Sequence, residues 1–316
     1  MNIYNTFEDN VAKFFDNLSP EVFEKSYCIF CNPSQFRHGL FQKKTMRIEA
    51  CDCGFIYNQT QPKQSVLDLF YEKSDAMKTW ANLKMSESQK KKQDEKFDLA
   101  LSFLRGKVES VCDIGCGVGY FLSKLPSDIL RVGVDSHQES LSYASKHGIE
   151  THAMGVAEWL NTCKKEGRKF DAVTLWGVLE HVKEPLKVLK DCYDIINKDG
   201  YLISCVPNVD SAVVRRFWKE CFTFQPVHLW YFNYDTLLRA YKYAGFKYAD
   251  SWTIEAEVRP LIKGLNGYGP YAPLPIWLEE KVMKRDVVEK MEKEIILTSR
   301  GYKIVAIGKK TWSTLQ

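Results

Sequence analysis

The chain has 316 residues, of which 45% are hydrophobic and 27% charged, and its formal net charge is +4. These values are typical of a folded globular protein of one or two domains and exclude a disordered or collagen-like chain. We expect no membrane span, because the chain lacks a run of about 18 apolar residues. The N-terminus lacks the basic and apolar segments of a signal peptide, so we expect a cytoplasmic protein. The basic run at residues 90–92 is followed at once by acids, which argues against nucleic acid as a partner.

Residues 1–63 are expected to form a small cysteine module. Cys28 and Cys31 form a C-x2-C pair, and Cys51 and Cys53 form a C-x-C pair. Four thiolates in two close pairs can bind zinc in a tetrahedral structural site. We therefore expect Zn²⁺ here, while cysteines without a metal, or His38 in place of one thiol, remain alternatives.

Residues 64–107 repeat apolar positions at helical spacing and are expected to form a helical linker or lid. From residue 108 to 316, short apolar strands alternate with helices, which predicts an α/β fold with a mostly parallel sheet. The strands are nearly continuous apolar runs, as in sheets that are covered on both faces. Residues 259–277 are rich in glycine, proline and aromatic residues and are expected to form an insert in this domain.

A glycine-rich turn is the strongest local signal. The string VCDIGCGVG at residues 111–119 places an acid at a strand end, two residues before the first of three glycines. Glycines let a ligand approach the backbone closely, and the acid suits a cationic amino-acid ligand. The glycine spacing is too short for the dinucleotide fingerprint.

With this string the sequence resembles the class I S-adenosylmethionine (SAM)-dependent methyltransferases. Within this family it resembles the zinc-ribbon-containing sugar and surface-glycan enzymes and the ubiquinone-type enzymes. The resemblance implies a Rossmann-like sheet of seven strands and a turn that holds the methionine part of SAM. The residues carried over are Asp113, Gly115, Cys116, Gly117 and Gly119.

The second and third strands end in further candidate cofactor contacts. Asp135 lies about 20 residues beyond the turn, where a carboxylate can accept the ribose hydroxyls, and Ser136 follows it. Capping of the next helix by Asp135 is the alternative. The resemblance places Val156 and Ala157 beside the adenine.

The fourth strand and its exit, FDAVTLWGVLEHV at residues 170–182, form the second strong match to the family. The resemblance places Trp176, Gly177 and Glu180 near SAM. His181 is a candidate catalytic residue, with a structural role as the alternative. The N/D-P-P-Y/F string of enzymes that methylate exocyclic amines is absent from this position.

Residues 206–246 resemble the acceptor-side segment of sugar methyltransferases, and His228 matches their histidine. A histidine near neutral pKa suits removal of a proton from an acceptor hydroxyl. Capping or aromatic packing by His228 is the alternative. The tyrosine and glutamate of sugar C-methyltransferases are missing before it, which favours an oxygen acceptor. Arg215 and Arg216 could bind a phosphate, as in a nucleotide-sugar or sugar phosphate, or lie on the surface.

The sequence thus predicts a SAM-dependent methyltransferase that acts on the oxygen of a small, sugar-like acceptor in carbohydrate biosynthesis. The alternatives are carbon or nitrogen methylation of a sugar, RNA methylation that uses the cysteine module, and SAM binding without turnover. The oligomeric state stays open.

Overall fold

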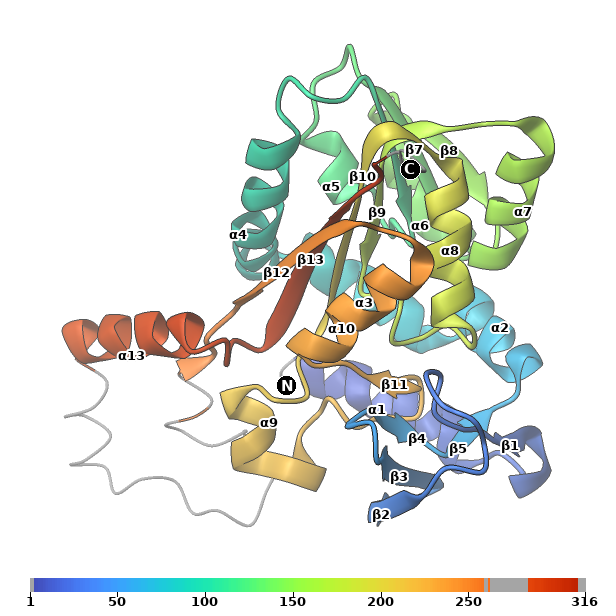
Figure 1. The fold of residues 1–316 in the computed structure, drawn as a ribbon, viewed down its shortest axis with the longest axis vertical. Helices are drawn as coiled ribbons and strands as arrows, with labels where there is room; N and C mark the ends of the chain where they lie inside the picture. The colour runs from blue at the N-terminus through green and yellow to red at the C-terminus, as the bar shows by residue number, and fades with distance from the viewer. Residues whose placement is uncertain (1–2, 259–260, 262–283, 312–316) are drawn as a thin grey trace, which may run out of the picture.

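A computed structural model describes residues 3–258, residue 261 and residues 284–311. Its centre is a seven-stranded sheet in the order β12-β13-β10-β9-β6-β7-β8 (Figure 1). The strands are β6 (Ser110–Ile114), β7 (Leu130–Asp135), β8 (Glu150–Ala153), β9 (Phe170–Trp176), β10 (Ile196–Pro207), β12 (Tyr248–Ile254) and β13 (Lys303–Lys309). Strands β6 to β10 are parallel, and β13 is antiparallel to both of its neighbours. This order confirms the predicted Rossmann-like, mostly parallel fold.

Helices cover both faces of the sheet, as the continuous apolar strands predict. One face packs on α4 (Glu87–Leu104), α5 (Tyr120–Ser123) and α6 (Gln138–Lys146), and the other on α7 (Val156–Glu166), α8 (Pro185–Ile195) and α10 (Tyr234–Ala244). Along β6, the side chain of Val111 packs in the core under α4–α6, and that of Cys112 packs in the core under α7, α8 and α10. With both faces covered, the carboxyl ends of the parallel strands are the place where this fold binds ligands.

The N-terminal segment begins with α1 (Ile3–Asp16), followed by a 3₁₀ turn (Pro20–Val22) and the pair β1 (Phe23–Lys25) and β5 (Thr60–Pro62). A second, four-stranded sheet has the order β11-β4-β3-β2. Its N-terminal strands are β2 (Arg37–Lys43), β3 (Met46–Cys51) and β4 (Ile56–Asn58).

The fourth strand of this small sheet, β11 (Trp230–Tyr231), comes from the acceptor-side segment, where Trp230 pairs with Tyr57 and Tyr231 with Ile56. Sequence patterning did not reveal β11, because a strand of two residues has no period of its own. The small sheet therefore joins the beginning of the chain to the segment that contains His228.

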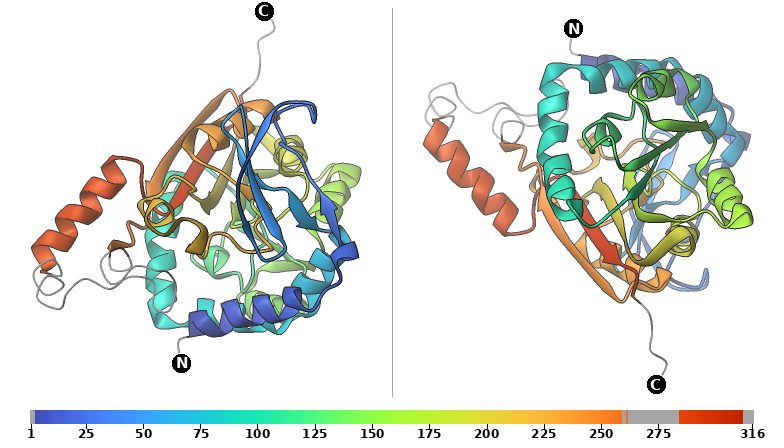
Figure 2. Two further views of the ribbon diagram at one scale, coloured as in Figure 1. Left: turned by 90° about the horizontal axis from the view of Figure 1, so that it is seen from below. Right: turned by 90° about the horizontal axis from the view of Figure 1, so that it is seen from above.

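Residues 64–107 are helical as predicted, in α2 (Gln64–Lys73), α3 (Asp75–Met85) and α4. The N-terminal elements and α2–α3 lie beyond the carboxyl ends of the parallel strands, as Figures 1 and 2 show from three directions. These helices are therefore in position to enclose a ligand that binds there.

The remaining elements are α9 (Ala212–Phe217), a 3₁₀ turn (Trp218–Glu220) and α13 (Arg285–Leu297), which extends beside the end of β12 (Figure 1). The insert predicted at residues 259–277 lies outside the described residues, apart from Leu261. Within the described part of the chain, no helix combines the length and apolar character that a membrane crossing requires.

Candidate active site

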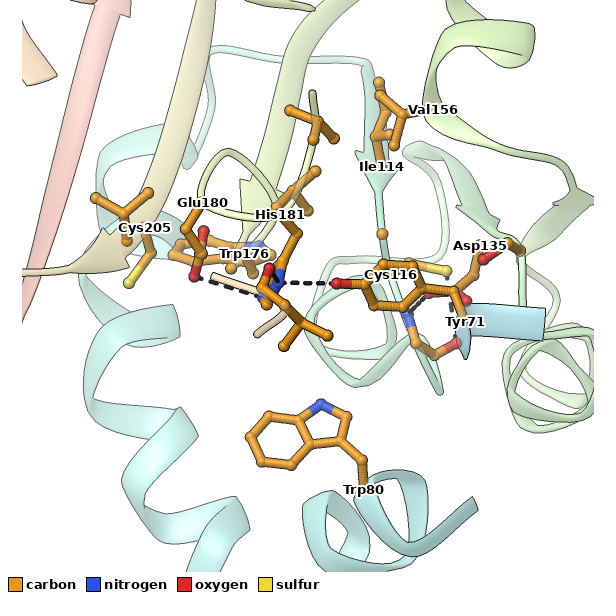
Figure 3. A pocket seen from close by; sticks show the side chains of 18 of the residues that line it. Tyr71, Trp80, Ile114, Cys116, Asp135, Val156, Trp176, Glu180, His181 and Cys205 are labelled. Atoms are coloured by element: carbon orange, nitrogen blue, oxygen red, sulfur yellow. Dashed lines mark hydrogen bonds and ion pairs between the residues drawn. The ribbon is translucent and has the colours of Figure 1, made fainter. Parts of the chain in front are cut away.

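A cavity of about 1070 Å³ lies at the carboxyl ends of the parallel strands. Asp113 on β6, Asp135 on β7 and Trp176 on β9 line one wall, and residues of α2, α3 and α4 line the other. Figure 3 shows Asp135 at one end of the first wall, Trp176 and Glu180 towards its other end, and Trp80 facing them from α3. Ligand pockets usually measure about 300–1,000 Å³, so this cavity has room for a cofactor and a second small molecule.

The glycine turn forms the floor of the cavity. The backbone N–H groups of Gly115 and Cys116 donate to the carbonyl of Val134, at 2.7 and 3.0 Å, which ties the turn to β7. Gly117 has a φ of +54°, and a Cβ added there would meet no atom within 4 Å. The turn therefore leaves open space for a ligand against the backbone, as a bound cofactor requires.

Gly119, which was expected in the part of the turn that holds the cofactor, lies outside the cavity lining. It precedes α5 with a φ of +70°. A Cβ added at Gly119 would lie 2.6 Å from the Cβ of Ala144. The structure thus gives Gly119 a packing role between α5 and α6 and supplies no cofactor contact for it.

Asp113 is 1% exposed and accepts a hydrogen bond from the Thr174 hydroxyl at 2.7 Å. Burial raises the pKa of this carboxyl to about 8, although the Thr174 hydrogen bond opposes the shift. A cation that enters the cavity beside Asp113 would stabilise its charged form.

Asp135 accepts hydrogen bonds from two backbone amides, that of Gly117 at 2.8 Å and that of His137 at 2.8 Å. Each carboxylate oxygen keeps a second lone pair that a ligand hydroxyl can use. Burial raises the pKa of Asp135, against the effect of these two amides. Ser136 lines the cavity beside it, and Val156 and Ala157 line it from the start of α7.

Two histidines meet in the cavity, with ring centroids 4.8 Å apart. The Nδ1 of His181 lies 2.8 Å from the carbonyl of Val227 and 2.8 Å from the hydroxyl of Tyr71. The Nδ1 of His228 lies 2.6 Å from the carbonyl of Thr223. Because a carbonyl can only accept, both Nδ1 atoms carry hydrogen, and in the neutral rings both Nε2 atoms are proton acceptors.

The protonation of His228 is shifted further by its surroundings. Burial, and then the neighbouring His181, lower the pKa of His228 well below its ordinary value. The side-chain amide of Gln225 lies 3.1 Å from its Nε2. His228 is therefore neutral near pH 7, which is the form that can accept a proton.

Two buried polar atoms of the cavity wall have no hydrogen-bond partner among the described residues, Trp176 Nε1 and Glu180 Oε2. Such atoms are rare in folded proteins and often meet a ligand or an ion. Glu180 Oε1 lies 3.9 Å from His181 Nε2. One ligand atom from each of Glu180, His181 and His228 lies within 4.8 Å of the others, so this trio could also hold a cation.

The N-terminal sheet holds the segment that contains His228. The backbone N–H of Asn58 and the side-chain amide of Gln61 both donate to the carbonyl of Leu229, at 2.9 and 3.2 Å. The N–H of Leu229 donates to the carbonyl of Glu180 at 2.8 Å. The residue after His228 is thus tied both to the small sheet and to the exit of β9.

The four N-terminal cysteines lie together, with all Sγ atoms within 4.8 Å of one another and those of Cys28 and Cys53 3.5 Å apart. The short C-x-C pair reaches this arrangement through a tight turn, in which the N–H of Gly54 donates to the carbonyl of Cys51 at 2.8 Å. His38 instead contacts Asp52 at 3.2 Å, which argues against its replacing a thiol. This geometry suits a tetrahedral zinc site.

The predicted arginine site is not part of the cavity. Arg215 pairs with Asp210 at 3.2 Å, and neither it nor Arg216 lines the cavity. Sequence reasoning also missed residues that do line it, because helical periodicity does not tell which face of α2, α3 or α4 meets a ligand. These residues are Tyr71, Trp80, Lys84 and Lys96, and Lys303 lines the cavity from the start of β13.

Comparison with known proteins identifies the family of the chain. A family model described as a methyltransferase domain matches residues 73–251, more than half of the chain. The chain belongs to this methyltransferase family. The glycine turn and the strand order 3-2-1-4-5-7-6 of its sheet agree with the class I SAM-dependent group, as predicted.

Individual relatives match over shorter stretches. The chain is 32% identical over 102 residues to the ubiquinone biosynthesis O-methyltransferase of Haemophilus ducreyi, which covers 30% of this chain and 43% of that protein. It is 32% identical over 131 residues to the tRNA U34 carboxymethyltransferase of Campylobacter fetus, covering 38% and 43%. The chain thus spans less than half the length of these two curated relatives.

A chain of the solved Haloferax volcanii complex between the Trm112 methyltransferase activator and a methyltransferase is similar in fold. The TM-score is 0.50 at 15% identity, and the similarity covers 75% of this chain and 98% of that one. At this identity the likeness concerns the fold alone.

Proposed function

We propose that this methyltransferase transfers the methyl group of SAM to an oxygen of a small acceptor, a sugar-like hydroxyl compound. The observation that carries the proposal is the joint position of two features in one cavity. The glycine turn with Asp113 and Asp135 lies on one side, and the His181–His228 pair lies on the other. A cofactor site and a proton acceptor in the same enclosed space are what O-methylation requires.

The cofactor side is assigned as follows. When bound, SAM supplies a methyl group that is activated by its sulfonium charge. Asp135 would hold the ribose hydroxyls, the turn at Gly115–Gly117 and the carboxylate of Asp113 would hold the methionine part, and Val156 and Ala157 would pack on the adenine. The open space at Gly117 and the unpartnered Trp176 Nε1 support this assignment.

On the acceptor side, His228 is assigned as the base that takes the hydroxyl proton on Nε2. The carbonyl of Thr223 holds its tautomer, so Nε2 accepts the proton while Nδ1–H stays hydrogen-bonded. His181, held in the same way by Val227, positions the acceptor and supports the ring of His228. Helices α2–α4 line the cavity on the other side and would limit the access of water to the reaction.

We also propose that Cys28, Cys31, Cys51 and Cys53 bind one structural Zn²⁺. The ion would fix the turns that bracket the small sheet, and β11 links that sheet to the residue after His228. The cysteines do not line the cavity, so the metal would act on the shape of the site and not on the reaction.

The test is incubation of the purified protein with methyl-labelled SAM and a panel of hydroxylated sugars, nucleotide-sugars and sugar phosphates. We expect labelled product from wild type, a much lower rate from His228→Ala, and no product from Asp135→Ala. Binding of S-adenosylhomocysteine (SAH) without turnover on any acceptor would instead favour a SAM-binding protein that has no catalytic role.

A second candidate function is tRNA modification, since one relative is named a tRNA U34 carboxymethyltransferase. A gel-shift assay with total tRNA, in the presence of SAH, separates the two. Retention of the tRNA at physiological salt, with loss of affinity as salt rises, would favour this candidate over a small acceptor.

A further inference from the structure

Three lysines from separate elements meet in the active-site cavity. Lys84 is near the end of α3, Lys96 is in the middle of α4, and Lys303 begins β13. All three line the cavity. Their charges act on one another, since Lys96 and Lys303 both lower the pKa of Lys84, after burial as the larger cause. The fold has thus brought lysines of α3, α4 and β13 to one cavity.

Two of these lysines have no carboxylate partner among the described residues. Lys96 is 5% exposed, and its ammonium group lies 5.0 Å from the ring centroid of Phe97 and 5.8 Å from that of Trp176. The ammonium group of Lys84 lies 4.2 Å above the ring of Trp80. A buried ammonium group held only by aromatic faces is costly, because cation–π contacts replace little of its lost hydration.

The nearby acids do not balance this charge. Glu255, which is 10% exposed at its side chain, lies 3.6 Å from the Lys303 ammonium group. Lys303, Lys96 and Lys84 together lower the pKa of Glu255, against the effect of burial. Lys303 and Lys96 also act on Glu180, but burial raises the pKa of that carboxyl. Asp113 also acts on Lys96, but burial raises the pKa of Asp113 to about 8. Among these three acids, Glu255 is the one whose charged form is favoured, and one carboxylate does not balance three lysines.

We propose that Lys84, Lys96 and Lys303 form an anion pocket that binds a carboxylate or phosphate group of the methyl acceptor. This inference rests on the proposed methyl transfer and narrows its substrate class to anionic acceptors. The three lysines would then have the anion-binding role that the sequence suggested for Arg215 and Arg216, because those arginines lie outside the cavity. Lys303 and Lys96 act on the pKa of Glu180, as does His181, so these two lysines and the histidine pair lie near the same carboxyl.

The cofactor has an α-carboxylate of its own, which is the competing source of this anion. Lys96 is the lysine whose charge acts on Asp113 in the glycine turn, so it faces the cofactor side as well. One carboxylate would neutralise one lysine of the three. Lys96 therefore lies between the two sides of the cavity, and Lys84 and Lys303 are the members of the anion pocket that we assign to the acceptor alone. The test must show that they do not hold the cofactor.

The experiment is calorimetric titration of the SAH-saturated protein with three probes of one scaffold. D-glucose is neutral, D-glucuronate carries a carboxylate, and D-glucose 6-phosphate carries a phosphate. We expect at least one anionic probe to bind and glucose not to bind. The anion that binds more tightly shows whether the pocket prefers a carboxylate or a phosphate. In Lys84→Gln the affinity for that anion should fall at least tenfold, while the dissociation constant of SAH stays within twofold.

The matched control is Lys78→Gln, because Lys78 lies on the same helix, is exposed and does not line the cavity. It should bind the probes as wild type does. Equal binding of glucose and the anions, no anion binding to the SAH-loaded protein, or anion binding unchanged in Lys84→Gln would each overturn the anion pocket. Loss of SAH affinity in Lys84→Gln would assign the lysines to the cofactor. Failure of wild type to bind SAH at all would instead refute the proposed function.

Discussion

The burial of Asp113 predicts a strong pH dependence of cofactor binding. If the carboxylate of Asp113 holds the ammonium group of the cofactor, the charged form must be present in the complex. With a pKa of about 8 in the free protein, a lower pH protonates Asp113 and weakens binding, and a higher pH strengthens it. The charged fraction rises from roughly 1% at pH 6 to roughly 24% at pH 7.5, so the affinity should rise about 25-fold, or ~2 kcal/mol.

Calorimetry with SAH at pH 6.0, 6.5, 7.0 and 7.5 measures this rise directly. Because binding releases the proton of Asp113, the observed heat should also depend on the ionisation enthalpy of the buffer, with nearly one proton released at pH 6. Asp113→Asn keeps an acceptor for the Thr174 hydroxyl but has no proton to lose. Its affinity should be low and nearly independent of pH. A wild-type affinity that changes less than threefold over this range, or the same slope in Asp113→Asn, would refute the reasoning.

Three further predictions concern packing, the base and the metal. Gly119→Ala should destabilise the protein by about 2 kcal/mol or more, because it strains a residue with positive φ and places a Cβ against Ala144; an unchanged Tm contradicts this. His228→Ala should lower kcat by about 10²-fold and leave the SAH dissociation constant unchanged, and wild-type turnover would remove His228 from the reaction. Elemental analysis should find about one zinc per chain. Cys51→Ser should lose the metal and lower Tm, whereas a metal-free wild type would contradict the zinc proposal.

Much of the cofactor side could be predicted because its residues lie next to one another in sequence. The run from Asp113 to Gly119 combines a strand, a turn and a helix start, and Asp135 ends the next strand. In a parallel sheet such strand ends lie along one edge, so local patterns suffice to place them. Gly119 shows the limit of this reasoning, since the pattern of glycines does not tell which one faces a ligand and which one packs against Ala144.

The acceptor side was harder to predict because long-range packing decides it. Tyr71, Lys84 and Lys96 are single positions on amphipathic helices, and their role depends on where the helices cross the sheet. Arg215 lies near His228 in sequence, yet it points to Asp210, because sequence proximity does not fix direction after an irregular segment. The pairing of β11 with the N-terminal sheet is likewise a contact between distant parts of the chain.

The central claim is that the turn at residues 113–117 and the carboxylate of Asp135 hold SAM with its methyl group toward the two histidines. A crystal structure of the protein soaked with SAH tests it most directly. The account predicts the ribose hydroxyls on Asp135, the homocysteine against the backbone of Gly115–Gly117, and the sulfur facing His181 and His228. SAH bound elsewhere, or a cavity that stays empty at saturating SAH, would contradict it.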